Sequence, residues 1–189
     1  MTVGTFALLA RGEPSLAVLQ TTPQASAQPA IAQESRVKAA FVVKFTQYTT
    51  WPAAAFESAT APFVIGIIGP SSSIADFEQE ARAIAGPRPI EVRLVTTPEG
   101  ATRCHAIYIS KADSRAEENW LQALRANPIL TVGETDRAIE YGAVIRFVTE
   151  GKKIRFEVSR PAMERAGLKI SSDMLRYAKT VHNKPEAQP

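Results

Sequence analysis

The sequence contains a single cysteine, Cys104, and only two histidines. One cysteine cannot form a disulfide within the chain, and no Cys-x-x-Cys or Cys/His spacing typical of a zinc site is present. The sequence therefore predicts no metal site. It also contains no run of about eighteen apolar residues, so it predicts no membrane-inserted helix. It predicts instead a domain that is held together by its apolar core.

The net charge is also small, because 22 Lys or Arg residues are nearly balanced by 19 Asp or Glu residues. From residue 151 onward there are nine basic and four acidic residues. These basic residues alternate with apolar ones, as on the solvated faces of a strand and of helices, and do not form the block typical of a nucleic-acid site. We therefore expect no nucleic-acid partner. The basic residues concerned include Lys152, Arg155, Arg165, Lys169, Arg176 and Lys179.

Residues 1–33 differ in composition from the rest of the 189-residue chain. They are rich in Pro, Gln and Ala, and residues 25–27 and 30–32 resemble signal-peptidase sites, but the apolar stretch before them is short. Two interpretations stay open, a degraded signal peptide with a misassigned start and a disordered leader. The remainder predicts one domain over residues 34–181 and a disordered tail over residues 182–189.

The domain opens with a predicted helix over residues 34–49. Val37, Phe41, Phe45 and Tyr48 recur there at helical spacing and predict its apolar face. Trp51 precedes a proline, which disfavours the helical conformation, so we expect the helix to end before it. At that corner the Trp51 ring can cover the core while its N–H finds an acceptor.

Short apolar runs alternate with helical patterns along the middle of the chain. The predicted strands are 63–68, 89–95, 106–109 and 128–132, and the predicted helices are 74–85 and 114–125. This alternation predicts an α/β fold, a three-layer sandwich whose mixed, mostly parallel sheet is flanked by helices.

The C-terminal part of the domain predicts an antiparallel hairpin and two closing helices. The hairpin comprises residues 143–149 and 153–158, with Gly151 in the left-handed conformation at the turn. Ser159 is expected to cap the first helix and Gly167 to end it. The second helix starts at Ser171 or Ser172 and carries Met174, Leu175, Ala178 and Val181 on one face.

No catalytic constellation is apparent. Cys104 and His105 are neighbours whose side chains point to opposite faces of a strand, so the imidazole cannot deprotonate the thiol. The other histidine, His182, falls in the predicted tail. We interpret Cys104 as a buried small residue, with a free thiol or an intermolecular disulfide as open alternatives. The carboxylates of Glu117, Glu118 and residues 134–140 are interpreted as solvated, and no enzymatic activity or cofactor is predicted.

Ser71, Ser72 and Ser73 follow Gly66-x-x-Gly69 at the start of a predicted helix. They can hold a small anion there, but the full glycine pattern of a phosphate loop is missing. The plainer interpretation is a helix cap and loop.

Five strings carry a resemblance to a known family. They are KAAFVVKFTQYTTWP (38–52), FVIGIIG (63–69), CHAIYIS (104–110), ILTVGE (129–134) and GAVIRFVTEGKKIRFEVSRPAMERAGLKISSDMLRYA (142–178). Occurring in this order over nearly the whole domain, they closely resemble the YfiR family of periplasmic proteins.

The resemblance implies an exported, non-catalytic protein that represses a membrane-bound diguanylate cyclase by binding the cyclase's periplasmic sensor domain. Loss of this restraint raises cyclic-di-GMP and promotes biofilm formation. It also implies an outer-membrane lipoprotein that sequesters the repressor, and a homodimer is a further open alternative. The chain departs from the family in its cysteines, because the family's partner for Cys104 in the first strand and its second pair near the hairpin are absent.

The sequence leads to two hypotheses for the function. The first is the repressor, for which Phe45, Tyr48 and Trp51 are the expected partner-binding residues, because aromatic side chains dominate binding hot spots. Core packing is the alternative for all three, and most of all for Phe45. The second is a periplasmic small-molecule or nucleotide-binding sensor with a pocket near residues 69–73.

Overall fold

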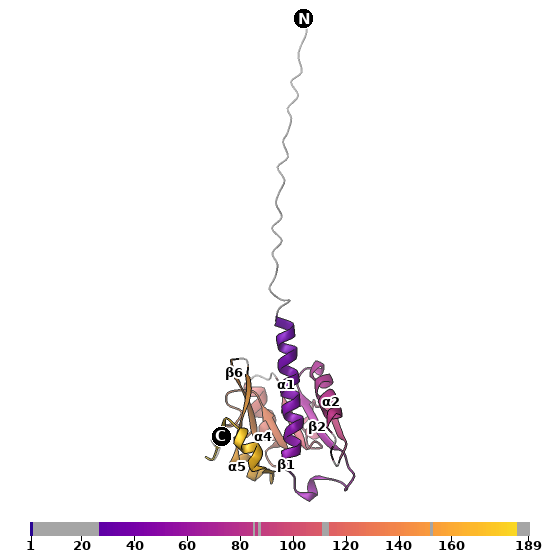
Figure 1. Cartoon of the computed structure of the whole chain (residues 1–189), viewed down its shortest axis with the longest axis vertical. Coiled ribbons are helices and arrows are strands. Elements are labelled where there is room, and N and C mark those ends of the chain that lie inside the picture. The colour runs from indigo at the N-terminus through magenta and orange to yellow at the C-terminus, as the bar shows by residue number, and fades with distance from the viewer. Residues whose placement is uncertain (2–26, 85, 87, 111–113, 152, 185–189) are drawn as a thin grey trace.

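The structure, a computed structural model, describes Met1 and residues 27–84, 86, 88–110, 114–151 and 153–184. The long helix α1 (Ala27–Tyr48) crosses the front of a sheet, with α2 beside it (Figure 1). The remaining helices are α2 (Ile74–Ala83), α3 (Pro98–Ala101), α4 (Ser114–Leu124), α5 (Arg160–Arg165) and α6 (Ser172–Tyr177), and two 3₁₀ turns are η1 (Ala53–Ala55) and η2 (Ser71–Ser73).

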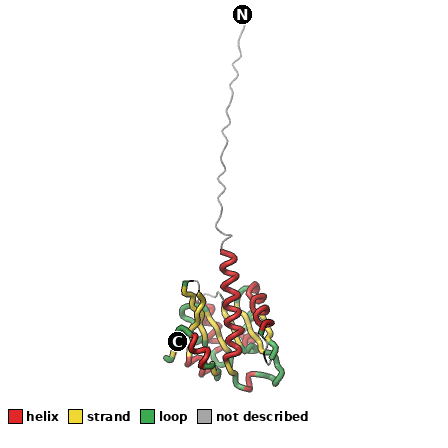
Figure 2. The backbone as a smooth tube through the Cα atoms, viewed as in Figure 1, coloured by secondary structure: helices red, strands yellow, loops and turns green. Residues whose placement is uncertain are grey.

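Within the described residues, seven strands form the main sheet in the order β3-β2-β4-β5-β6-β7-β9. The strands, drawn in yellow, lie behind the long helix α1 (Figure 2). The strands from β3 to β6 are mutually parallel, β7 pairs with β6 in antiparallel fashion, and β9 is parallel to β7. A separate pair joins β1 to β8. The bounds are β1 Thr49–Thr50, β2 Phe63–Ile68, β3 Ile90–Leu94, β4 Ala106–Ile109, β5 Leu130–Gly133, β6 Ile145–Glu150, β7 Lys153–Ser159, β8 Lys169–Ile170 and β9 Thr180–His182.

Helices cover both faces of this sheet, which confirms the predicted fold class. Buried residues of α1, α2, α5 and α6 form one core with one face of the sheet. Residues of α3, α4 and the turn around Ala138 form a second core with the other face. The central strands β2, β4 and β5 are buried along their whole length, as expected of parallel strands that are covered twice.

The face that α1 turns toward the sheet differs from the predicted one. The helix buries the small residues Ala39, Val42 and Val43, which allow it to lie close to the strands. Of the predicted stripe, Phe45 is buried at 2% exposure, whereas Val37 and Tyr48 are 38% and 39% exposed. The helix also begins at Ala27, earlier than predicted. Aromatic side chains marked the helix correctly, and Phe45 belongs to the core with Phe41 packed against it, but Tyr48 points to solvent.

The C-terminal part follows most of its predicted signals. Gly151 at the hairpin has a φ of 59°, and Gly167 after α5 has a φ of 66°. The Ser159 hydroxyl accepts a hydrogen bond from the Ala162 N–H at 3.2 Å and so caps α5. Ser171 caps α6 in the same way.

The prediction was wrong at the end of the last helix. α6 stops at Tyr177, and residues 180–182 form β9 beside β7. Val181 and His182 therefore belong to the sheet and not to a helix or a tail. Residues 180–182 pair with residues 157–159 of β7, which are distant in the sequence. Local periodicity does not report such long-range pairing.

Glu117, predicted to be solvated, is fully buried in α4. Its Oε1 accepts hydrogen bonds from the backbone N–H groups of Glu134 at 2.7 Å and Thr135 at 3.2 Å, and the Thr135 hydroxyl donates to its Oε2. A Cβ at Gly133 would stand 2.7 Å from the same Oε1, so glycine leaves room for the carboxylate. Glu117 thus fixes the loop that follows β5.

Replacing Glu117 with alanine would leave two backbone donors without an acceptor. We expect the Glu117→Ala variant to lose about 3 kcal/mol in the free energy of unfolding, because hydrogen bonds to buried charged groups contribute about 1.5–3 kcal/mol each. Urea unfolding followed by circular dichroism measures this loss. The neighbouring Glu118→Ala variant is the matched control and should stay within about 0.5 kcal/mol; similar losses in both would contradict the assigned role.

Candidate functional site

An open groove runs between α1, β7 and α6 and has a volume of about 700 Å³. Its floor is aromatic: the rings of Phe45 and Phe156 meet edge to face with centroids 4.9 Å apart, and Phe41 lies 5.9 Å from Phe45. We call this surface the aromatic groove and define it by Phe41, Lys44, Phe45, Tyr48, Arg155 and Tyr177.

The rim of the aromatic groove combines exposed tyrosines with positive charge. Tyr177 is 75% exposed, which is unusual for so large a ring and is not required by the core. Lys44, Arg155 and Arg176 contribute basic side chains, and the one acidic side chain on the rim, Asp173, is bound to Arg176. The groove therefore offers apolar rings and net positive charge to whatever binds there.

Two of the three residues expected to bind a partner, Phe45 and Tyr48, lie together in this groove. Phe45 is part of its floor and of the core, while Tyr48 is exposed at its edge. Trp51 lies elsewhere, half-buried at the corner that follows β1. Its indole N–H donates to the His105 carbonyl at 3.0 Å and its ring contacts Phe63, as predicted for a residue that covers the core.

A second, smaller site lies where the carboxyl ends of β2 and β4 meet α1 and α2. It is a cavity of about 370 Å³, and its lining includes Ser72 and Ser73 but not Ser71. The sheet order places β3 on one side of β2 and β4 on the other, so the cavity sits where the chain reverses direction across the sheet. We call it the switch-point cavity and define it by Glu34, Lys38, Ser72, Ser73, Asp76, Tyr108 and Glu134.

An ion-pair network forms one wall of the switch-point cavity. The Lys38 ammonium lies 2.6 Å from the Glu34 carboxylate and 2.9 Å from that of Glu134, and the Tyr108 hydroxyl donates to Glu134. Burial would lower the pKa of Lys38, but the hydrogen bonds and charges of the two glutamates raise it above its usual value. Lys38 therefore stays charged and already has two anionic partners.

Cys104 and His105 point to opposite sides of the sheet, as predicted. Burial raises the pKa of the Cys104 thiol to about 11, so little thiolate forms near neutral pH. His105 Nδ1 accepts from the Val64 N–H at 3.0 Å and its Nε2 faces the Ala55 carbonyl at 3.1 Å. Burial lowers the pKa of His105, and its neutral ring ties η1 to β2. His105 therefore has a structural role, and Cys104 is a buried free cysteine.

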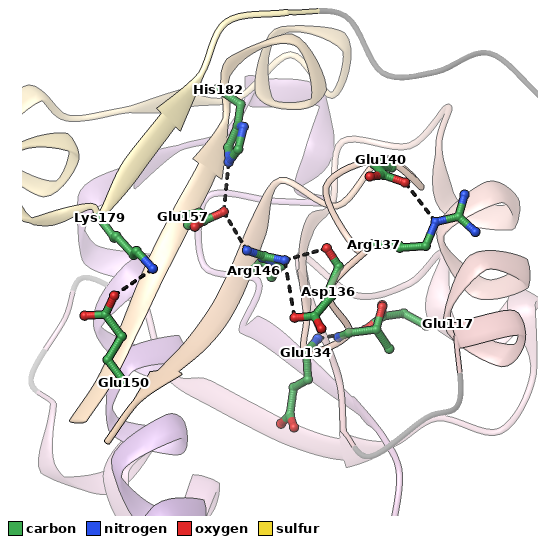
Figure 3. A network of polar contacts seen from close by, with 11 residues as sticks. Glu117, Glu134, Asp136, Arg137, Glu140, Arg146, Glu150, Glu157, Lys179 and His182 are labelled. Atoms are coloured by element: carbon green, nitrogen blue, oxygen red, sulfur yellow. Dashed lines mark hydrogen bonds and ion pairs between the residues drawn. The ribbon is translucent and has the colours of Figure 1, made fainter. Parts of the chain in front are cut away.

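A polar network joins β6, β7 and β9 (Figure 3). Of its members, the sequence analysis considered His182, which it placed in the tail, but neither Arg146 nor Glu157. Arg146 lies 3.0 Å from the Glu157 carboxylate, and the His182 ring lies 2.8 Å from the same oxygen. Arg146 also bonds to the carbonyl of Asp136. Burial would raise the pKa of Glu157, but the hydrogen bonds from His182 and Arg146 and the Arg146 charge hold it below its usual value. The network fastens β9 to the sheet.

Among their described residues, neither the aromatic groove nor the switch-point cavity carries an arrangement typical of a metal site. In the described ranges no group of three or more His, Cys, Asp or Glu side chains is placed to hold a metal ion. Over the same residues no helix is both long and apolar enough to cross a membrane.

The YfiR/HmsC-like family matches the chain over residues 35–179. The chain belongs to this family. At the level of the family, YfiR/HmsC-like proteins are periplasmic and regulatory rather than catalytic, and the process that they regulate is diguanylate cyclase activity.

Similar folds occur among solved structures. The ABC domain of Streptococcus pneumonia in complex with L-Trp has a TM-score of 0.54 at 12% identity, covering 76% of this chain and 60% of that one. A conserved domain protein of Vibrio cholerae O1 biovar eltor has a TM-score of 0.52 at 14% identity, covering 62% and 54%. At these identities the likeness concerns the fold, and the YfiR/HmsC-like chain spans less than two thirds of either protein. No match is found among curated proteins.

Glu157 makes the stability of the fold depend on pH. Its pKa is lower in the folded state than in the unfolded state, where it is about 4.3. Its contribution to the free energy of unfolding is therefore fully present above the unfolded pKa and is lost as the pH falls through the folded pKa. We therefore expect the natural protein to have a higher free energy of unfolding than the Glu157→Gln variant at pH 5, and this difference to become smaller as the pH is lowered to 3. Urea titrations at each pH measure it. The exposed Glu164→Gln variant should give a small gap throughout, and a Glu157 gap that widened on acidification would contradict the network.

The missing family disulfide has a geometric counterpart in β2. A Cβ at Gly66 would stand 2.9 Å from Cys104 Sγ. In a disulfide, the Cβ of one cysteine lies at about this distance from the sulfur of the other, because a C–S bond and an S–S bond of roughly 2.04 Å meet at an angle between them. We expect Gly66→Cys, refolded in a glutathione redox buffer, to lose both free thiols.

The gain from this crosslink should fall below the roughly 3–4 kcal/mol typical of disulfides, because the new Cβ also crowds Ile107 and Val95. Thiol titration and urea unfolding with and without reductant measure both effects. Gly66→Ala carries the same crowding without the thiol and is the control. Two titratable thiols after oxidative refolding would contradict the geometry.

Proposed function

We propose that this protein binds the periplasmic sensor domain of a membrane-bound diguanylate cyclase and represses the cyclase, which lowers cyclic-di-GMP and biofilm formation. The observation that carries the proposal is membership of the YfiR/HmsC-like family over residues 35–179. A repressor of this kind needs a recognition surface and no reactive group, which agrees with the inert thiol of Cys104 and the structural role of His105.

The aromatic groove is the surface that we assign to the sensor domain. Hot spots of protein interfaces are enriched in tyrosine, tryptophan and arginine, and the rim supplies Tyr48, Tyr177 and Arg155 around an aromatic floor. The basic rim fits a partner segment that carries acidic side chains beside apolar ones. Phe45 supports the groove from below, and Trp51 supports the neighbouring corner, so both act through packing.

Two other occupants are possible in principle for such a groove, the sequestering outer-membrane lipoprotein and a second copy of this chain. Both compete with the sensor domain if they use the same residues. Analytical ultracentrifugation of the protein alone, and competition between the lipoprotein and the sensor domain, separate these cases from binding of the cyclase.

Reversal of the rim charge tests the groove. We expect Lys44→Glu with Arg155→Glu to weaken binding of the purified sensor domain at least tenfold, because the acidic partner segment would then meet like charge. Isothermal titration calorimetry measures the affinity. Arg103→Glu, an exposed charge reversal beyond α3 on the other face, is the matched control and should bind as the natural protein does.

The same variants have a cellular readout. Deletion of the gene should raise cyclic-di-GMP; complementation with the natural protein or Arg103→Glu should restore the low level, and the groove variant should not. An unchanged cyclic-di-GMP level after deletion would overturn the repressor function. A groove variant that binds and represses normally would overturn the assigned surface.

A second candidate function is a small-molecule sensor, and the switch-point cavity favours it. In open α/β sheets, ligands bind outside the carboxyl ends of strands where the strand order reverses, which is where this cavity lies. Its volume of about 370 Å³ is within the range of small-molecule pockets, roughly 300–1,000 Å³.

A further inference from the structure

The switch-point cavity contains a hydroxyl group that the fold itself does not use. Ser73 stands at the N-cap position of α2, yet its side chain makes no capping hydrogen bond, because η2 runs into the helix with Ser73 already in the helical conformation. The residue is only 8% exposed and lines the cavity, and its hydroxyl has no hydrogen-bond partner among the described residues. The cap interpretation of the serine triplet therefore does not account for Ser73.

The carboxylate of Asp76 is in a similar position one turn further along α2. It lines the cavity, and over the described part of the chain it forms neither an ion pair nor a hydrogen bond. Its neighbours across the cavity are already paired, since Glu34 and Glu134 share the Lys38 ammonium. The half-buried carboxylate of Asp76 and the hydroxyl of the buried residue Ser73 thus line the same cavity, and neither has a hydrogen-bond partner among the described residues.

The charge of the lining decides the kind of ligand. Three carboxylates, from Glu34, Asp76 and Glu134, face one ammonium, that of Lys38, so the cavity is electronegative. A phosphate group or a nucleotide would meet this negative charge at close range, which is unfavourable. The carboxylates also do not converge into a group that could hold a metal ion within the described residues. An organic ammonium ion fits both facts, because it carries positive charge and N–H donors and needs no converging set of metal ligands.

We propose that the switch-point cavity binds a small organic ammonium compound, with Asp76 pairing the ammonium group and Ser73 accepting a hydrogen bond from it. The inference rests on the second candidate function and names its ligand class. Lys38 keeps Glu34 and Glu134 in place, so it shapes the wall of the site. Gly69 forms the turn behind the serines, where a Cβ would approach the Ser110 carbonyl oxygen to 3.0 Å.

The aliphatic diamine putrescine, the amino alcohol ethanolamine and the dianion succinate are suitable probes of the full-length protein. Chemical-shift changes in ¹H–¹⁵N spectra, recorded at low and at physiological salt, report both affinity and place. We expect putrescine or ethanolamine to bind and to shift the amide signals of residues 72–76 and 34–38, and succinate to leave these signals unchanged.

Two substitutions then assign the contacts. We expect Asp76→Asn to weaken binding of the amine at least tenfold and Ser73→Ala to weaken it severalfold, in keeping with a lost charge pair and a lost hydrogen bond. Glu99→Gln, an exposed carboxylate of α3 on the other face of the sheet, is the control and should leave the affinity unchanged. Circular dichroism checks that each variant is folded.

Several results would overturn the proposal. They are binding of succinate in place of the amines, absence of binding by either amine at millimolar concentration, and amine binding that Asp76→Asn leaves unchanged. These titrations contain no sensor domain, so their failure leaves the repressor function standing. Conversely, a protein that binds the amine but not the sensor domain would overturn the repressor function alone.

Discussion

The contact between Lys38 and Glu134 joins the two halves of the structure. Lys38 belongs to α1, whereas Glu134 follows β5 at the carboxyl edge of the parallel strands, and their charged groups lie 2.9 Å apart in a largely buried setting. Glu134 is held by its own backbone N–H, which donates to the buried Glu117 carboxylate of α4. A chain of charge-assisted hydrogen bonds thus runs from the helical layer in front of the sheet to the layer behind it.

Both candidate sites depend on the helix that this contact positions. The middle of α1 supplies Glu34 and Lys38 to the switch-point cavity, and its C-terminal end supplies Phe45 and Tyr48 to the aromatic groove. Between them, Ala39, Val42 and Val43 hold the helix against the strands. The switch-point cavity and the aromatic groove therefore share α1 as a common wall, so the two proposed sites lie on one helix.

Sequence patterns predicted the elements better than their contacts. Glycine and proline signals, alternating strands and helices, and the serines that cap α5 and α6 gave the fold class and most boundaries, because these effects are local. The burial of Glu117 and the network of Arg146, Glu157 and His182 join residues far apart in the chain, so no local pattern reports them. The aromatic stripe of α1 was found, but which side faces the sheet depends on the close approach that Ala39 permits. Family resemblance supplied the function that spacing alone could not.

The central claim is that the aromatic groove is where the sensor domain of a diguanylate cyclase binds. Hydrogen exchange of the full-length protein, measured with and without the purified sensor domain, tests this claim most directly because it reports protection along the whole backbone. We expect added protection in residues 41–48, 154–156 and 173–177, and none at α3 and α4. Protection confined to α3 and α4, or to the edge strand β3, would contradict it.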